Sequence, residues 1–143
     1  MPLLPVIRTH GRVQVGAYAW NEYTGASLHL SFSAAGPHPE LSVVHEIGHF
    51  LDHQAFGHPG SFASDAGDHH KEVMDAIGQS AAIRALERLQ SRRVILLQVR
   101  NRRETEPVDQ RMVRYYLGLR ERFARAYAQY SRLPRSPPSF ERS

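Results

Sequence analysis

The stretch VVHEIGHFLD, residues 43–52, carries most of the information in this chain. Its apolar residues and the lack of proline between residues 40 and 54 favour a helix that is partly buried. On a helix, His45 and His49 lie one turn apart on the same face, so their two imidazoles can bind one metal ion. Glu46 lies beside them, where it can take a proton from a water molecule that the metal activates. The motif therefore predicts a zinc peptidase site.

Gly48 is the unusual residue within this predicted helix. Glycine in a helix interior costs roughly 1 kcal/mol relative to alanine. Its presence predicts that another segment, or the metal site itself, approaches the helix backbone closely. Pro39 and Glu40 are typical of a helix start, because a carboxylate in the first turn interacts favourably with the helix dipole.

A catalytic zinc ion needs a third protein ligand and leaves a fourth position for water. His53 continues the spacing of four, but on a continuous helix it lies about 9 Å along the axis from the midpoint of the two motif histidines. That separation is far beyond a coordination bond of roughly 2 Å. His53 is therefore a poor candidate.

Glu121 is a better candidate for the third ligand. It forms one helical stripe with Ala124 and Ala128, whose small side chains allow close packing against the motif helix. A glutamate on an alanine-lined face is costly to bury without a partner, and a divalent metal is such a partner. The alternative is a surface glutamate in ion pairs with Arg125 or Arg114.

Length and composition indicate one globular domain. The chain has 143 residues, of which 41% are hydrophobic, so we expect a domain over residues 1–133 and a flexible proline- and serine-rich tail over 134–143. It has no cysteine, which excludes disulfides and thiolate metal sites. No apolar run approaches the roughly 20 residues needed to cross a membrane, and the first residues do not resemble a secretion signal. We therefore expect a cytoplasmic protein.

The charge is distributed unevenly along the chain. Residues 1–83 contain three basic and eight acidic side chains, whereas residues 84–143 contain fifteen basic and six acidic ones. A dense arginine run over residues 84–103 could attract nucleic acid or an acidic protein partner. The alternative is a solvated arginine-rich surface, which we favour because no aromatic residue interrupts the run to stack on bases.

The remaining segments give a coarse order of elements. Residues 27–32 predict a strand, 34–39 a turn, 57–67 a loop, 69–90 one helix, 102–109 a loop, and 112–131 a helix with a break near Gly118. Residues 94–99 fit either a strand or part of a helix. We expect the strand at residues 28–32 to have an open edge onto which an extended peptide can add.

The motif residues together with the later segments Tyr115-Tyr116 and residues 121–127 (ERFARAY) resemble a gluzincin-type metallopeptidase. The chain is most similar to the zincin-like domains of large polyvalent proteins from phages and mobile elements, and more distantly to the catalytic domain of anthrax lethal factor. The resemblance covers roughly residues 28–54 and 115–130. It implies an α+β fold, in which a small sheet packs on the motif helix and on a later glutamate-bearing helix.

The resemblance also implies roles for individual residues. Glu121 is expected to be the third zinc ligand, and Tyr115 to stabilise the oxyanion, although Tyr116 could exchange roles with it. Relatives often carry proline two residues before the glutamate, where this chain has Leu119. Asp52 shares the face of the histidines, and we expect it to orient an imidazole or to hold a neighbouring segment; a charge at the helix end is the alternative.

These observations predict a zinc-dependent endopeptidase that hydrolyses a peptide or protein substrate with Glu46 as the general base. The alternative is a zincin-fold interaction module with limited catalysis, which binds nucleic acid or an acidic partner through the arginine-rich C-terminal half.

Overall fold

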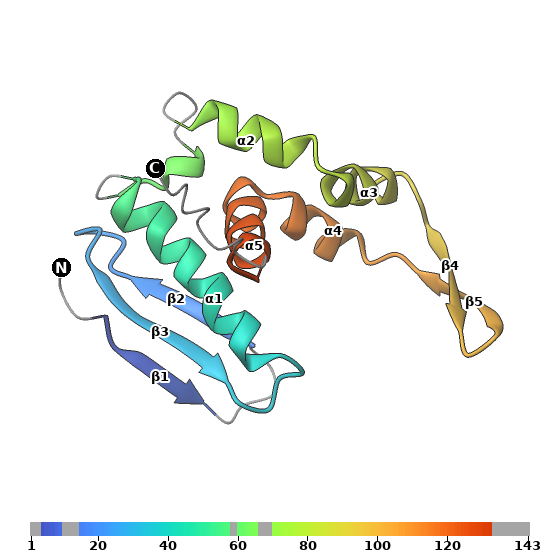
Figure 1. Cartoon of the computed structure of the whole chain (residues 1–143), viewed down its shortest axis with the longest axis horizontal. Coiled ribbons are helices and arrows are strands. Elements are labelled where there is room, and N and C mark those ends of the chain that lie inside the picture. Colours follow the sequence, from blue (N-terminus) through green and yellow to red (C-terminus); the bar gives the residue numbers. More distant parts are fainter. Residues whose placement is uncertain (1–3, 10–14, 58–59, 66–69, 133–143) are drawn as a thin grey trace, which may run out of the picture.

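The computed structural model describes residues 4–9, 15–57, 60–65 and 70–132. They form an α+β structure with a three-stranded sheet, five α-helices and a separate two-stranded hairpin (Figure 1). The predicted fold class is therefore confirmed. The whole predicted tail, residues 134–143, lies outside the described residues. Within the described ranges, no helix is long and apolar enough to cross a membrane.

The larger sheet has the strand order β1-β3-β2, with β1 (Val6–Thr9) parallel and β2 (Gly16–Trp20) antiparallel to β3 (Ser27–Ser33). β3 corresponds to the strand predicted at residues 27–32. The prediction that it has an open edge is wrong, because β1 and β2 occupy both of its edges. The free edge nearest the motif helix belongs to β2.

The motif helix α1 (Pro39–Phe50) lies across one face of this sheet and continues into a π-helical turn, η1 (Leu51–Ala55) (Figure 1). Phe50 packs with Tyr18, Leu30 and Phe62 in a buried core between the helix and the sheet. This core fixes the face of α1 that is turned away from the sheet, which is the face that carries the two histidines.

Helix α5 (Leu119–Arg132) packs closely along α1. Gly48 makes this possible, because a Cβ atom at that position would lie 2.8 Å from Ala124 Cα. Glu121, Ala124 and Ala128 are all buried. Both predictions about this contact, the close approach at Gly48 and the buried alanine stripe, are confirmed.

Three further helices pack on one another and on α5, namely α2 (Lys71–Gly78), α3 (Ala81–Leu89) and α4 (Gln110–Leu117). The single helix predicted for residues 69–90 is wrong. The chain breaks after α2, and the Ser80 hydroxyl caps α3 by accepting a hydrogen bond from the backbone N–H of Ile83. The predicted break near Gly118 is confirmed between α4 and α5.

Strands β4 (Val94–Val99) and β5 (Arg102–Pro107) form an antiparallel hairpin that projects away from the rest of the molecule (Figure 1). The loop predicted for residues 102–109 is wrong over β5. Every residue of β5 is exposed, so its sequence lacks the apolar alternation by which a strand is detected. Hydrogen bonding to β4 defines the strand instead.

Candidate metal centre

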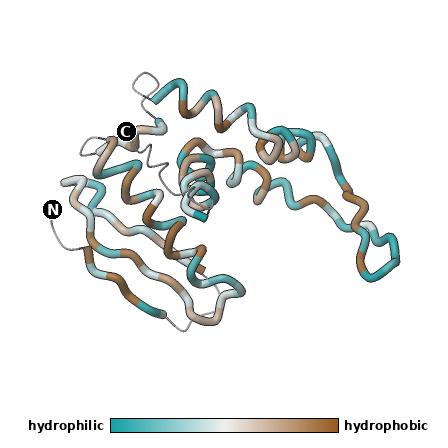
Figure 2. The backbone as a smooth tube through the Cα atoms, viewed as in Figure 1, coloured by the Kyte–Doolittle hydropathy of each residue, from teal (hydrophilic) through white to brown (hydrophobic). Residues whose placement is uncertain are grey.

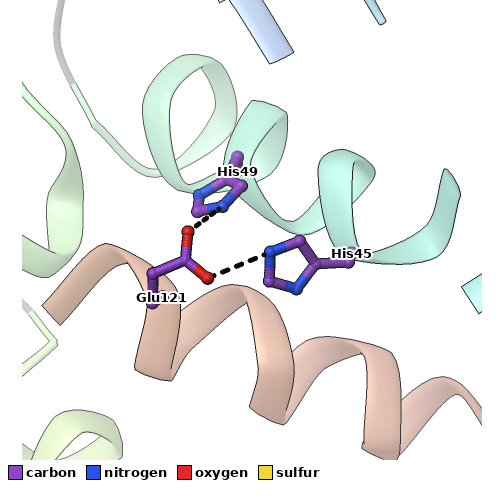
Figure 3. A group of neighbouring side chains, drawn as sticks. All are labelled: His45, His49 and Glu121. Carbon is purple, nitrogen blue, oxygen red and sulfur yellow. Dashed lines mark hydrogen bonds and ion pairs between the residues drawn. The ribbon is translucent and has the colours of Figure 1, made fainter. Parts of the chain in front are cut away.

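Two imidazoles from α1 and one carboxylate from α5 meet at the contact between these helices (Figure 3). His45 Nε2 lies 3.2 Å from Glu121 Oε2, and His49 Nε2 lies 3.1 Å from Glu121 Oε1. The potential ligand atoms of the three residues all lie within 4.8 Å of one another. The three residues predicted as metal ligands are thus brought together, although Glu121 lies 72 positions after His49 in the sequence.

This group has the composition and spacing of a metal site. Bonds of 2.0–2.1 Å in a tetrahedral arrangement place neighbouring ligand atoms about 3.3 Å apart, close to the two nitrogen–oxygen distances observed here. The Oε2 atom of Glu121 is buried and makes no hydrogen bond of good geometry with any described residue, although His45 Nε2 is near. A buried carboxylate oxygen of this kind suits coordination to a cation. The group could therefore hold a metal ion.

The surroundings of Glu121 keep it ionised. Burial alone would raise its pKa, but the neighbouring His45, His49 and Tyr115 side chains outweigh burial and lower the pKa well below its ordinary value. A deprotonated carboxylate and two imidazoles are ligands that zinc accepts readily.

Glu46 lies beside this group but is held by the sheet. Its carboxylate is buried beside β2, where the backbone N–H of Tyr18 favours the ionised form. Gly16, also on β2, leaves it room, since a Cβ atom there would lie 2.9 Å from Glu46 Oε1. Burial raises the pKa of Glu46 above its ordinary value, while the nearby His49 and His45 partly oppose that effect. A carboxylate with a raised pKa is better matched to proton transfer near neutral pH.

Of the two tyrosines considered for the oxyanion, Tyr115 is the one that faces the site. Its hydroxyl lies beside the Glu121 carboxylate in the cleft, and partial burial together with that neighbouring carboxylate strongly raises the pKa of Tyr115, so it stays protonated. Tyr116 packs instead under the Arg125 guanidinium, whose carbon lies 4.0 Å from the ring centroid. The geometry thus favours Tyr115 for an interaction with a bound ligand.

An open cleft of about 600 Å³ adjoins this group. One wall is the outer side of β2, and the opposite wall comes from the junction of α4 and α5. The cleft is lined by Gly16, Ala17, Tyr18, Trp20, Glu46, His49, Phe62, Asp65, Arg114, Tyr115, Gly118, Leu119, Arg120 and Glu121. The contribution of β2, and of Gly16 in particular, has no local signal in the sequence, because it depends on tertiary packing.

Asp52 holds a neighbouring segment. It is fully buried and accepts hydrogen bonds from the Ser64 backbone N–H at 2.8 Å and from the Ser64 hydroxyl at 2.6 Å. Ser64 lies in η2 (Ala63–Asp65), a short 3-10 helix whose Asp65 binds the Arg120 guanidinium at 2.7 Å. Asp52 therefore links η1, at the end of the motif helix, to the start of α5 through η2. It makes no hydrogen bond with His45 or His49, and its burial excludes a free helix-end charge.

His53 is not part of the metal group, as its position along the helix predicts. It is buried in the core, where its Nδ1 atom lies 2.9 Å from the Tyr18 hydroxyl. Burial lowers the pKa of His53, and the nearby Arg120 charge adds to that effect.

No protein-family model, curated protein or solved structure matches this chain.

Proposed function

We propose that this chain is a zinc-dependent metallopeptidase of the gluzincin type, with His45, His49 and Glu121 as the zinc ligands. The observation that carries the proposal is the convergence of both motif histidines on Glu121, with Glu46 adjoining them in the same cleft. Structural zinc sites are typically closed by four protein ligands. This group offers three ligands, and the buried Glu46 carboxylate lies beside them without being one of them. A site that only stabilised the fold would not need that carboxylate.

Zinc at this position would polarise a scissile carbonyl and lower the pKa of water toward about 7. Glu46 then removes a proton from the attacking water and delivers it to the leaving amine. The Tyr18 N–H and the space at Gly16 orient the Glu46 carboxylate for this transfer. The Tyr115 hydroxyl supplies a neutral hydrogen-bond donor for the developing oxyanion.

The cleft suits an extended peptide. β2 pairs only with β3 among the described strands, so its outer edge carries unpaired backbone groups along the cleft. An extended substrate can add to such an edge through main-chain hydrogen bonds. In this proposal the substrate strand adds to β2 and not to β3.

The test is a Glu46→Gln variant, assayed with a diverse peptide library and read by mass spectrometry. The zinc-loaded wild type should cleave peptides, whereas Glu46→Gln should bind zinc equally and lose at least about 10²-fold in rate. Glu40→Gln is the matched control, because Glu40 lies on the same helix but outside the cleft. Near-normal cleavage by Glu46→Gln would refute the assigned role.

A further inference from the structure

The hairpin β4–β5 is the one element of the described structure that packs extensively only on itself. Its base is held by the Gln110 side chain, which donates to the backbone carbonyls of Leu89 and Arg92. Beyond that base the strands extend into solvent, with Val94 and Leu96 57% and 62% exposed. Figure 2 shows a hydrophilic tip beyond a more hydrophobic base. A two-stranded hairpin without further packing is only marginally stable in water. The extension of this arm into solvent therefore indicates that it contacts a binding partner.

The charge on and around the arm has no counterpart within the described structure. Residues 84–107 contain seven arginines against three glutamates, and all seven arginines are exposed. They form no ion pair with any described residue, whereas Arg120, Arg122 and Arg125 of the body each have one. The unpaired positive charge is complementary to a polyanion.

The strand register separates the acidic side chains from one face of the arm. Gln98 pairs with Arg103, Leu96 with Thr105 and Val94 with Pro107, so these six residues share one face. Glu104 and Glu106 pair with Leu97 and Ile95 on the opposite face. The first face is therefore free of acid and carries adjacent glutamine and arginine side chains near its tip.

The turn at the tip has arginine where another residue would fit better. Arg100 and Asn101 have φ angles of 44° and 66°, as a two-residue turn with both central residues at positive φ requires. Asn-Gly is the favoured pair for such turns, and a long side chain at positive φ is uncommon. Arginine at this strained position is consistent with a role in binding anions.

We propose that the β4–β5 hairpin is an arm that binds duplex DNA, independently of the metal centre. A two-stranded ribbon fits the major groove, which is about 12 Å wide. Arginine and glutamine are the side chains that pair with guanine and adenine edges there, and Arg103 and Gln98 lie together on the acid-free face. The remaining arginines neutralise phosphates.

The same surface argues against single-stranded nucleic acid. No aromatic residue occurs between residues 84 and 107, and single strands are bound mainly by stacking of bases on aromatic side chains. A duplex needs only the charge and the ribbon shape. The absence of aromatic residues, which disfavours base stacking, is therefore compatible with duplex binding.

The test measures binding of the intact zinc-loaded chain to a labelled 20-base-pair DNA duplex by fluorescence anisotropy at several salt concentrations. The wild type should bind with an affinity that falls steeply with salt. Arg102→Ser/Arg103→Ser should weaken binding at least about tenfold and reduce the salt slope by up to about 2. The control Arg8→Ser/Arg132→Ser removes two exposed arginines of the body that form no ion pair with any described residue, and it should bind like the wild type.

A second variant, Arg100→Asn/Asn101→Gly, separates binding from folding. It should stabilise the turn yet reduce the salt slope by about 1. Failure of the wild type to bind at low salt, or equal losses in the arm and body variants, would overturn the proposal. Tighter binding to a single strand of the same sequence, or to polyglutamate, would overturn the assignment to duplex DNA. None of these outcomes depends on peptide cleavage, so the test is distinct from that of the metal centre.

Discussion

Replacing Gly48 with alanine tests how the fold positions the metal centre. The new Cβ atom would lie 2.8 Å from Ala124 Cα, whereas ordinary contacts begin at about 3.4 Å. Because the obstructing atom is backbone, α1 and α5 must separate by about 0.6 Å or more. Gly48 is next to His49, and Ala124 is one turn from Glu121, so this separation occurs directly at the site.

The expected effects on stability and on metal binding differ. Overpacking costs about 1–3 kcal/mol, and the gain in helix propensity offsets about 1 kcal/mol of it. The free energy of unfolding of the zinc-free chain should therefore fall by only about 0–2 kcal/mol. Metal–ligand distances tolerate changes of about 0.2 Å, so zinc affinity should fall at least about tenfold.

The assay is competition with a chromophoric zinc chelator, combined with urea unfolding of the zinc-free chain. Gly78→Ala is the control, because a Cβ there meets only the end of the Arg122 side chain at 3.7 Å. Gly78→Ala should leave zinc affinity unchanged. If Gly48→Ala is as stable as this control and binds zinc as tightly as the wild type, the contact between Gly48 and Ala124 does not position the zinc ligands.

Three further outcomes are expected. Gly16→Ala should leave the fold stable but reduce peptide cleavage in the library assay, because the added Cβ displaces the flexible end of Glu46 from a distance of 2.9 Å; unchanged rates would count against that positioning. Zinc at 100 times its dissociation constant should stabilise the wild type by about 2.7 kcal/mol in thermal unfolding and have a much smaller effect on His49→Ala. Burial lowers the pKa of His53 in the folded chain, so below about pH 6.5 the unfolded chain binds more protons at this histidine than the folded chain does. That contribution to stability is complete above pH 6.5 and is lost as the pH falls toward the folded-state pKa, by at most about 1.4 kcal/mol per pH unit. Urea unfolding of His53→Gln should be less sensitive to acid than that of the wild type, and equal sensitivity would contradict this assignment.

The part of the site that lies on α1 and α5 could be predicted because helical periodicity is local. His45 and His49 share a face through spacing alone, and the alanines that follow Glu121 mark a close helix contact. Gly48 also carried information, since a poor helix former inside a helix needs a packing reason. These signals converge on the same pair of helices.

Strand β5 and the position of β2 could not be predicted, because both depend on which strands pair with each other and not on the local sequence. β5 is wholly exposed and reads as a polar loop until its hydrogen bonds to β4 are known. The placement of β2 beside Glu46 depends on the sheet order, which no spacing in the sequence encodes. The break before α3 did have a local signal, because Ser80 is a favoured helix cap.

Zinc content of the purified chain, measured by elemental analysis beside Glu121→Gln, tests the central claim most directly. Glu87→Gln is the control, because Glu87 is a half-exposed glutamate that pairs with Arg122 away from the cleft. We expect about one zinc per chain in the wild type and in this control, and little or none in Glu121→Gln after dialysis. A wild type that takes up no zinc when it is supplied, or a Glu121→Gln variant that retains it, would contradict the assigned ligand set.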